Sequence, residues 1–284
     1  MAHLSRPDPR DLPHLTALLD DPDADVRAEV HAALLRFGPA LESELARQLS
    51  SAPAHQLELA QGFCETLRAG RMQQQWPACV LQDDEHLALE ASLDLLADVD
   101  APWGRSPLPV LLDQMAQDFH DSGLSPSVRD LHTFLYLLEG FSAPVSDYYH
   151  PRNSNLIEVI ARREGLQISL ASIAMLLGNR IGVTLYGFNL PGHFMYMQVL
   201  PEGPELYDPF RNGEPLSSAT QAYLFRSLDL RNPEDYMRLR ASVPEIILRV
   251  LRNLVSACKR AQLPGLEARF QACFDELMEA IRKR

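Results

Sequence analysis

Two short strand-like runs inside an otherwise helical sequence constrain the fold of this chain most. The runs "VTLYGFNL" (183–190) and "HFMYMQVL" (193–200) are joined by a Pro-Gly turn, and "ELYD" (205–208) follows the loop "PEGP". An apolar segment with helical spacing, "REGLQISLASIAMLLG" (163–178), comes directly before them. A helix followed by short strands with tight turns favours a small antiparallel sheet. The centre of the chain therefore predicts a compact α+β module.

Helical patterns fill the sequence on both sides of this module. Residues 12–34 carry apolar side chains at helical spacing on either side of the turn "DDPDADVR", and this pair resembles a HEAT repeat, whose helices stack into a solenoid. Two more helical runs, 244–262 and 266–281, end the chain. The predicted fold class is α+β and mainly helical, with the small antiparallel sheet flanked by repeat-like helices.

The composition narrows the classes of function. Acidic residues outnumber basic ones, 38 against 26, and the net charge of −12 argues against nucleic-acid or anionic-membrane binding. No apolar run approaches the ~20 residues that span a bilayer, and the N-terminus lacks the apolar segment of a secretion signal. The four cysteines form no CxxC pair. We expect a cytoplasmic protein that needs no metal or cofactor.

Capping signals mark the helices on either side of Gly165. Asn155 with Glu158 three residues later has the spacing of a capping box, and Gly165 suits the left-handed position that ends a helix. Ser169 then opens the next helix, where serine is among the best capping residues. A nucleophile at this place would also benefit from the positive end of the helix dipole.

Ser169, His193 and Asp208 are the three polar residues of the module with the chemistry of a triad. His193 begins a strand and Asp208 ends the next one. An imidazole can serve as the base of a nucleophile, and a carboxylate can orient the imidazole. Symmetric pairing around "PEGP" puts His193 and Asp208 on one sheet face but roughly 13 Å apart, at ~3.3 Å per residue. A loop starting two residues earlier puts them directly opposite, so the face is predicted and the register stays open.

Three blocks of this module resemble a known family. They are 147–183, "GFNLPGHFMYMQ" and "LYDPF", and they are similar to the bacterial SirB-type family, whose core is transglutaminase-like and related to the papain-type cysteine peptidases. The resemblance covers roughly Leu108 to Leu216. The "RNL" at 252–254 is similar to the tetratricopeptide-like tail of the same family. Together with the HEAT-like helices at the start of the chain, this resemblance predicts three domains: a HEAT-like region at 1–80, the transglutaminase-like core at 81–232 and a tetratricopeptide-like tail at 233–284.

The superfamily resemblance implies a Cys-His-Asp triad, and its positions fall on Ser169, His193 and Asp208. Serine stands at the cysteine position, as expected throughout the SirB-type branch, and Gln167 stands where that branch usually has proline. A helix N-terminus and an imidazolium can lower the pKa of a thiol from ~8.5 into the neutral range, but no similar shift ionises a serine. Ser169 would need general-base help and an oxyanion hole.

Three hypotheses for the function follow. The first is a binding or regulatory protein that recognises a protein or peptide with a non-catalytic triad site. The second is a serine amidase, peptidase or acyltransferase with Ser169 as nucleophile, and the third is a helical scaffold with a vestigial site. The residues predicted to line a ligand site are Tyr148, Tyr149, Asn153, Ser154, Gly192 and Phe194.

Overall fold

The structure, a computed structural model, describes residues 8–190, 192–228, 235 and 240–284. The chain forms two compact units. One consists of the described part of Met1–Gln75 together with Asp100–Pro107, and the other of Trp76–Val99 and the described part of Leu108–Arg284. Pro191 of the predicted turn and the predicted boundary between 232 and 233 lie outside the described residues.

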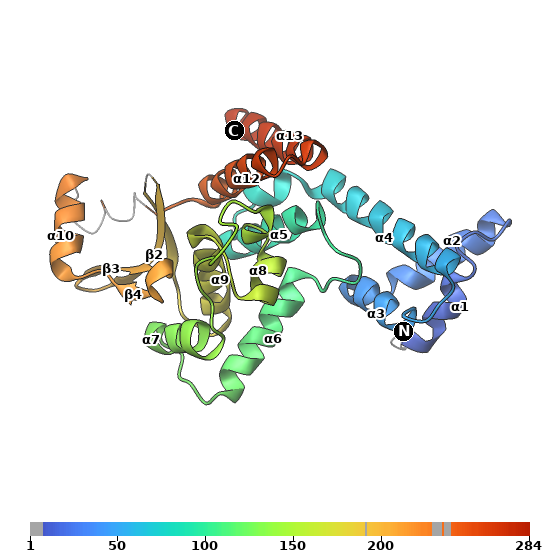
Figure 1. Cartoon of the computed structure of the whole chain (residues 1–284), viewed down its shortest axis with the longest axis horizontal. Helices are drawn as coiled ribbons and strands as arrows, with labels where there is room; N and C mark the ends of the chain where they lie inside the picture. Colours follow the sequence, from blue (N-terminus) through green and yellow to red (C-terminus); the bar gives the residue numbers. More distant parts are fainter. Residues whose placement is uncertain (1–7, 191, 229–234, 236–239) are drawn as a thin grey trace. The chain divides into compact units, whose positions relative to one another are not determined.

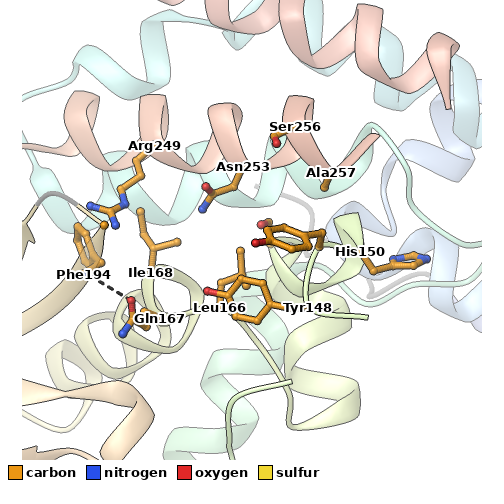
Figure 2. Close-up of a pocket in the computed structure, with 13 residues that line it drawn as sticks. Tyr148, His150, Leu166, Gln167, Ile168, Phe194, Arg249, Asn253, Ser256 and Ala257 are labelled. Carbon is orange, nitrogen blue, oxygen red and sulfur yellow. Dashed lines mark hydrogen bonds between the residues drawn. The ribbon is translucent and has the colours of Figure 1, made fainter. Parts of the chain in front are cut away.

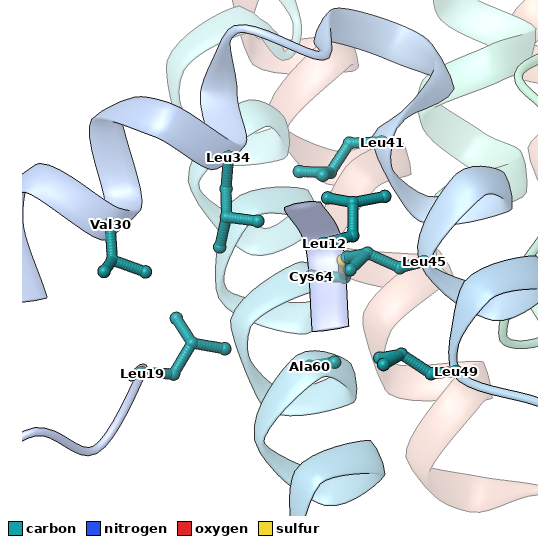
Figure 3. Close-up of a cluster of buried hydrophobic side chains, with 9 residues drawn as sticks. All are labelled: Leu12, Leu19, Val30, Leu34, Leu41, Leu45, Leu49, Ala60 and Cys64. Carbon is teal, nitrogen blue, oxygen red and sulfur yellow. The ribbon is translucent and has the colours of Figure 1, made fainter. Parts of the chain in front are cut away.

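The first unit is a set of helices around one apolar core. Its helices are α1 (Leu12–Thr16), α2 (Ala24–Leu35), α3 (Leu41–Gln48) and α4 (Ala54–Gln75). Asp23 caps α2 by accepting a hydrogen bond from the backbone N–H of Asp25. Leucines from α1, α2 and α3 converge on the small side chains of α4 (Figure 3). The buried core residues are Leu12, Leu19, Val30, Leu34, Leu41, Leu45, Leu49, Ala60 and Cys64.

The second unit is built around the helix α9 (Gln167–Arg180), whose first twelve residues are all buried. Such a helix is apolar on every side because neighbours surround it. It packs against strand β2 and against helices α5, α6 and α8 (Figure 1). The helices before it are α5 (Glu85–Asp98), α6 (Leu108–Asp121), α7 (Val128–His132), the π-helix η4 (Thr133–Leu138) and α8 (Leu156–Arg162). Short 3-10 turns are η1 (Pro9–Asp11), η2 (Gly38–Ala40), η3 (Ala78–Leu81), η5 (Pro151–Asn153) and η6 (Pro209–Arg211).

The sheet has four antiparallel strands in the order β1-β2-β3-β4. They are β1 (Tyr186–Leu190), β2 (His193–Leu200), β3 (Gly203–Asp208) and β4 (Glu214–Pro215). Leu200 pairs with Gly203, so the hairpin between β2 and β3 has a loop of two residues. This register lies between the two that the sequence left open. It keeps His193 and Asp208 on the same sheet face, as predicted, because a shift by two residues preserves the face.

Of the two predicted ends of α8, only the N-terminal one agrees with the structure. The Asn155 side chain accepts from the backbone N–H groups of Ile157 and Glu158, which confirms the predicted cap. The prediction that Gly165 ends the helix in a left-handed conformation is wrong, because Arg163 takes that conformation with φ of 61°. Gly165 is instead required by space, since a Cβ atom there would come within 2.6 Å of the Val159 side chain.

Helices also end the second unit. They are α10 (Ser218–Ser227), α12 (Val243–Arg260) and α13 (Pro264–Arg282), of which the last two pack against each other. Ser242 and Glu245 form a capping box at the start of α12. With one small antiparallel sheet among many helices, the predicted α+β, mainly helical fold class is confirmed. Throughout the described ranges, every helix is too short or too polar to cross a lipid bilayer.

Gly213 provides a test of the packing behind the sheet. It has φ of 68°, and a Cβ atom there would come within 2.7 Å of Tyr136 and 2.8 Å of His132. Gly182 has a similar φ of 81° but nothing within 4 Å of its Cβ position. We expect Gly182→Ala to lower the free energy of unfolding by about 1 kcal/mol, from backbone strain alone. Gly213→Ala should lower it by about 2–4 kcal/mol, because overpacking adds to the strain. Chemical denaturation measures both, and equal losses would contradict the close packing.

Candidate functional site

His193 and Asp208 come together at the end of the β2–β3 hairpin. Tyr196 pairs with Tyr207, so Asp208 lies diagonally across from His193 on the same face. His193 Nε2 is 3.2 Å from Asp208 Oδ2. The other oxygen, Oδ1, accepts a hydrogen bond of 2.9 Å from the backbone N–H of Phe210, which caps η6. The carboxylate is almost fully buried and is held by both contacts.

Gln167, the first residue of α9, occupies the other side of the imidazole. Its Nε2 lies 2.8 Å from His193 Nδ1, and its Oε1 accepts a hydrogen bond of 3.4 Å from the backbone N–H of Phe194. Because the backbone N–H needs the oxygen as its acceptor, the amide NH2 faces the ring, where it lies 3.2 Å from Nε2 as well. The shorter contact of 2.8 Å assigns Nδ1 as the acceptor of the amide N–H, which leaves Nε2–H to donate to Asp208.

Ser169 lies away from the imidazole. It is the third residue of α9, fully buried, and its Oγ donates a hydrogen bond of 2.8 Å to the carbonyl of Asn153. The prediction that Ser169 caps the helix is wrong, because the helix begins two residues earlier, with Leu166 at the capping position. Two residues turn the helix by about 200°, so Ser169 points to the side opposite Gln167. The structure thus brings together His193 and Asp208 of the predicted triad, with Gln167 in contact with His193.

A network of aromatic side chains lies close enough to the carboxylate to feel its charge. Tyr196 OH lies 2.8 Å from His132 Nε2 and 3.2 Å from Tyr136 OH, and the Tyr196 and Tyr207 rings stack at 5.6 Å. Burial lowers the pKa of His132 to about 4 and raises the pKa of the Tyr136 and Tyr196 phenols, with the charge of Asp208 as a smaller contribution. The network is therefore neutral at physiological pH.

A pocket of about 240 Å³ lies beside Gln167 (Figure 2). It is lined by Tyr148, Tyr149, His150, Ser154, Leu166, Gln167, Ile168, Gly192, Phe194, Arg249, Asn253, Ser256 and Ala257. Of the residues predicted to line a ligand site, Tyr148, Tyr149, Ser154, Gly192 and Phe194 lie in its wall.

Asn153, which was also predicted to line the ligand site, has a structural role instead. It is fully buried, its Nδ2 donates to the carbonyls of Asp147 and Tyr148, and its Oδ1 accepts from Arg162. It therefore shapes the loop that carries the two tyrosines rather than lining the pocket.

Helix α12 contributes a side of the pocket that sequence reasoning missed. Arg249, Asn253 and Ser256 project from it, with Arg249 and Asn253 reaching toward the start of α9 (Figure 2). Their spacing of i, i+4 and i+7 places them on one face of the helix, which was a readable signal. This spacing alone does not indicate a binding site, because the sequence does not show that α12 packs near the β1–β2 turn.

Comparison with known sequences places this fold and site in a class. Residues 109–252, about half of the chain, match the family model described as the transglutaminase-like superfamily. The chain belongs to this superfamily.

Relatives named UPF0162 protein are similar to this chain over parts of its length. The one from Xylella fastidiosa (strain 9a5c) is 29% identical over 217 residues, 72% of this chain and 76% of the relative. The one from Vibrio cholerae is 37% identical over 87 residues, 30% of this chain and 32% of the relative. The one from Pseudomonas aeruginosa is 32% identical over 120 residues, 41% of this chain and 43% of the relative. No solved structure matches the chain significantly.

The partly buried imidazole of His132 makes stability depend on pH. Its pKa is about 4 in the folded protein, and an unfolded histidine has a pKa of about 6.5. The unfolded chain therefore takes up a proton first as the pH falls, and the free energy of unfolding decreases between about pH 6.5 and pH 4, by up to about 3 kcal/mol. Chemical denaturation across this range measures the slope. His132→Gln should flatten it, whereas His120→Gln, at an exposed position on α6, should leave it unchanged. An unchanged slope in His132→Gln would contradict the assignment.

Cysteine substitution tests which residue faces the imidazole. In Gln167→Cys a thiol replaces the amide beside His193 Nδ1, at the N-terminus of α9. We expect a thiol pKa below the usual ~8.5, seen as iodoacetamide alkylation that persists at neutral pH and weakens in a Gln167→Cys, His193→Ala double variant.

Ser169→Cys is the matched control, because its thiol would be fully buried and turned away from the ring. It should resist alkylation in the folded protein. Rapid, His193-dependent alkylation of Ser169→Cys, with a slow reaction of Gln167→Cys, would reverse the assignment. Mass spectrometry separates both from the native thiols at Cys64, Cys79, Cys258 and Cys273.

Proposed function

We propose that this chain is a non-catalytic member of the transglutaminase-like superfamily that recognises a peptide segment of a partner protein. The single observation that carries the proposal is the contact of 2.8 Å between Gln167 Nε2 and His193 Nδ1. In a triad, the nucleophile is served by the ring nitrogen that does not face the carboxylate, and Asp208 faces Nε2. Here it faces a carboxamide.

A carboxamide cannot replace the thiol in this chemistry. Its nitrogen lone pair is delocalised into the carbonyl, so the group neither ionises at neutral pH nor attacks an acyl carbon. The hydrogen bond also occupies the lone pair that His193 would need for removing a proton from a nucleophile. His193 and Asp208 keep the mutual geometry of a triad. However, the group beside the other ring nitrogen is an amide, which cannot attack a substrate.

The serine-enzyme hypothesis finds less support in the geometry. A serine nucleophile requires a base within hydrogen-bond reach and access for the substrate. The Ser169 hydroxyl donates to Asn153 instead, and its side chain is fully buried. These two facts favour a structural role for Ser169.

The same proposal extends to the helices around the core. The helices of the first unit are taken as HEAT-like, and α12 with α13 as the tetratricopeptide-like tail of the SirB-type branch. Stacked helix pairs present surfaces suited to peptides and proteins. A role in the cytoplasm, without nucleic acid, membrane, metal or cofactor, completes the proposal.

Activity-based labelling tests the non-catalytic part. We expect a fluorophosphonate probe, an iodoacetamide probe and a biotinylated amine offered with an acyl donor to give no labelling that depends on His193. Gln167→Cys serves as the positive control for the iodoacetamide probe. Labelling of wild-type Ser169 that disappears in His193→Ala would sink the proposal in favour of a serine enzyme.

Peptide selection tests the recognition part. Random peptides displayed on phage are selected on the wild-type chain and counter-selected on Asn253→Trp, in which an indole fills the pocket. We expect sequences that bind the wild type and lose at least about tenfold in affinity for the variant, since a filled pocket excludes the anchoring side chain. Selection of the same sequences by both proteins would argue for a scaffold that binds elsewhere.

A further inference from the structure

Arg249 places a fixed positive charge in the pocket wall. One of its nitrogens, Nη1, donates to Asn189 Oδ1, to the Leu190 carbonyl at 2.9 Å and to the His193 carbonyl at 3.4 Å. The guanidinium also lies 5.4 Å from the centre of the Phe194 ring. Burial lowers its pKa, but arginine stays protonated at all physiological pH values. Among the residues that the structure describes, no carboxylate forms an ion pair with it.

The N-terminus of α9 adds a second source of positive potential. Leu166, Gln167 and Ile168, at the start of this 14-residue helix, line the pocket. The N–H groups of a helix's first turn have no acceptor within the helix, and no side chain in the described ranges caps this one. A helix N-terminus with such free N–H groups favours an anion.

An unpaired hydroxyl gives an independent indication of a ligand. Ser154 is 3% exposed, lines the pocket, and its Oγ has no hydrogen-bond partner among the described residues. Such a group loses free energy unless something accepts or donates a hydrogen bond there. Asn253 and Ser256 add neutral polar groups from α12, and none of the lining residues that the structure describes is acidic, in a chain with 38 Asp and Glu residues.

We propose that this pocket binds a carboxylate of a peptide, with Arg249 as the main cationic contact and the start of α9 as a further donor. This inference rests on the proposed peptide recognition and names its chemical class. A planar carboxylate matches the fork of a guanidinium, and a single cation balances a single negative charge. The exposed rings of Tyr148 and Tyr149 offer apolar surface for the rest of the peptide.

The size of the pocket favours a peptide group over a cofactor. Its volume of about 240 Å³ is below the ~300–1,000 Å³ of pockets that enclose drug-sized ligands. One side chain or one chain terminus fits this space. A phosphate dianion generally calls for more positive charge than one guanidinium supplies.

A peptide array tests the proposal on the full-length protein. The array carries tetrapeptides whose last two positions run through all amino acids, each printed as a free acid and as a C-terminal amide. We expect binding to peptides with a carboxylate, and the amides containing Asp or Glu separate a side-chain carboxylate from a terminal one. In solution, Arg249→Gln should weaken the best free-acid peptide about 10- to 100-fold, through loss of a charge-assisted pair.

Asn253→Asp is a second variant that tests the same inference if Arg249→Gln does not fold. It places a carboxylate one helical turn from Arg249 while leaving the arginine's bonds to the β1–β2 turn in place. We expect a loss of about tenfold or more. The control is Arg252→Gln, which removes the same charge at an exposed position over the Phe274 ring, outside the pocket lining. It should change the affinity less than about twofold.

Three results would overturn the inference. They are equal binding of neutral amides and free acids, stronger competition by inorganic phosphate than by acetate, and no binding to any peptide on the array. Amides that bind the wild type but not Asn253→Trp would overturn only the carboxylate class and leave the peptide-recognition proposal standing. Labelling experiments decide the non-catalytic proposal separately.

Discussion

The hydrogen bonds of one side-chain amide connect the central helix of the second unit to its sheet. Gln167 reaches from the first turn of α9 to the ring of His193 and to the backbone N–H of Phe194, so it joins two elements that meet at the site. Because the amide is oriented by a backbone N–H, it fixes the tautomer of the imidazole as well. The pairing of His193 with Asp208 then follows, since only Nε2–H is left to donate.

The network of aromatic side chains lies beside this arrangement. Asp208 accepts hydrogen bonds from His193 and from the backbone N–H of Phe210, and these two contacts hold its carboxylate in place. Beside it, burial holds His132 and the phenols of Tyr136 and Tyr196 in their neutral forms.

The sequence predicted the elements better than the contacts between them. Alternation and helical periodicity gave the strands, the fold class and the shared face of His193 and Asp208, because these depend on local pattern. The hairpin register depends on whether the loop has two residues or more, and registers differing by two residues bury the same side chains. Pattern alone could not choose among them.

Local pattern was also insufficient to predict which side chain of α9 faces His193. Serine is a good capping residue and stands at the position to which the resemblance pointed, so the sequence indicated Ser169 and gave Gln167 no part in the triad. The decision depended on where the helix begins, and a difference of two residues moves a side chain to the opposite face. Arg249 of α12 is 56 to 60 positions from the residues of β1 and β2 that it contacts, and local sequence carries no signal for such pairing.

Helix α12 is part of the pocket and not only part of the C-terminal helical pair. Arg249 uses carbonyl oxygens of Leu190 and His193 as acceptors, so it ties α12 to the turn that begins β2. The polar face of this helix consequently has a fixed placement relative to the imidazole and to the start of α9. Catalysis would require a free ring nitrogen and a reacting atom at this place, whereas binding requires only a rigid polar cleft with a defined charge. In the proposed binding role, the amide of Gln167 needs only to keep the helix and the sheet together at this cleft, which its two hydrogen bonds do.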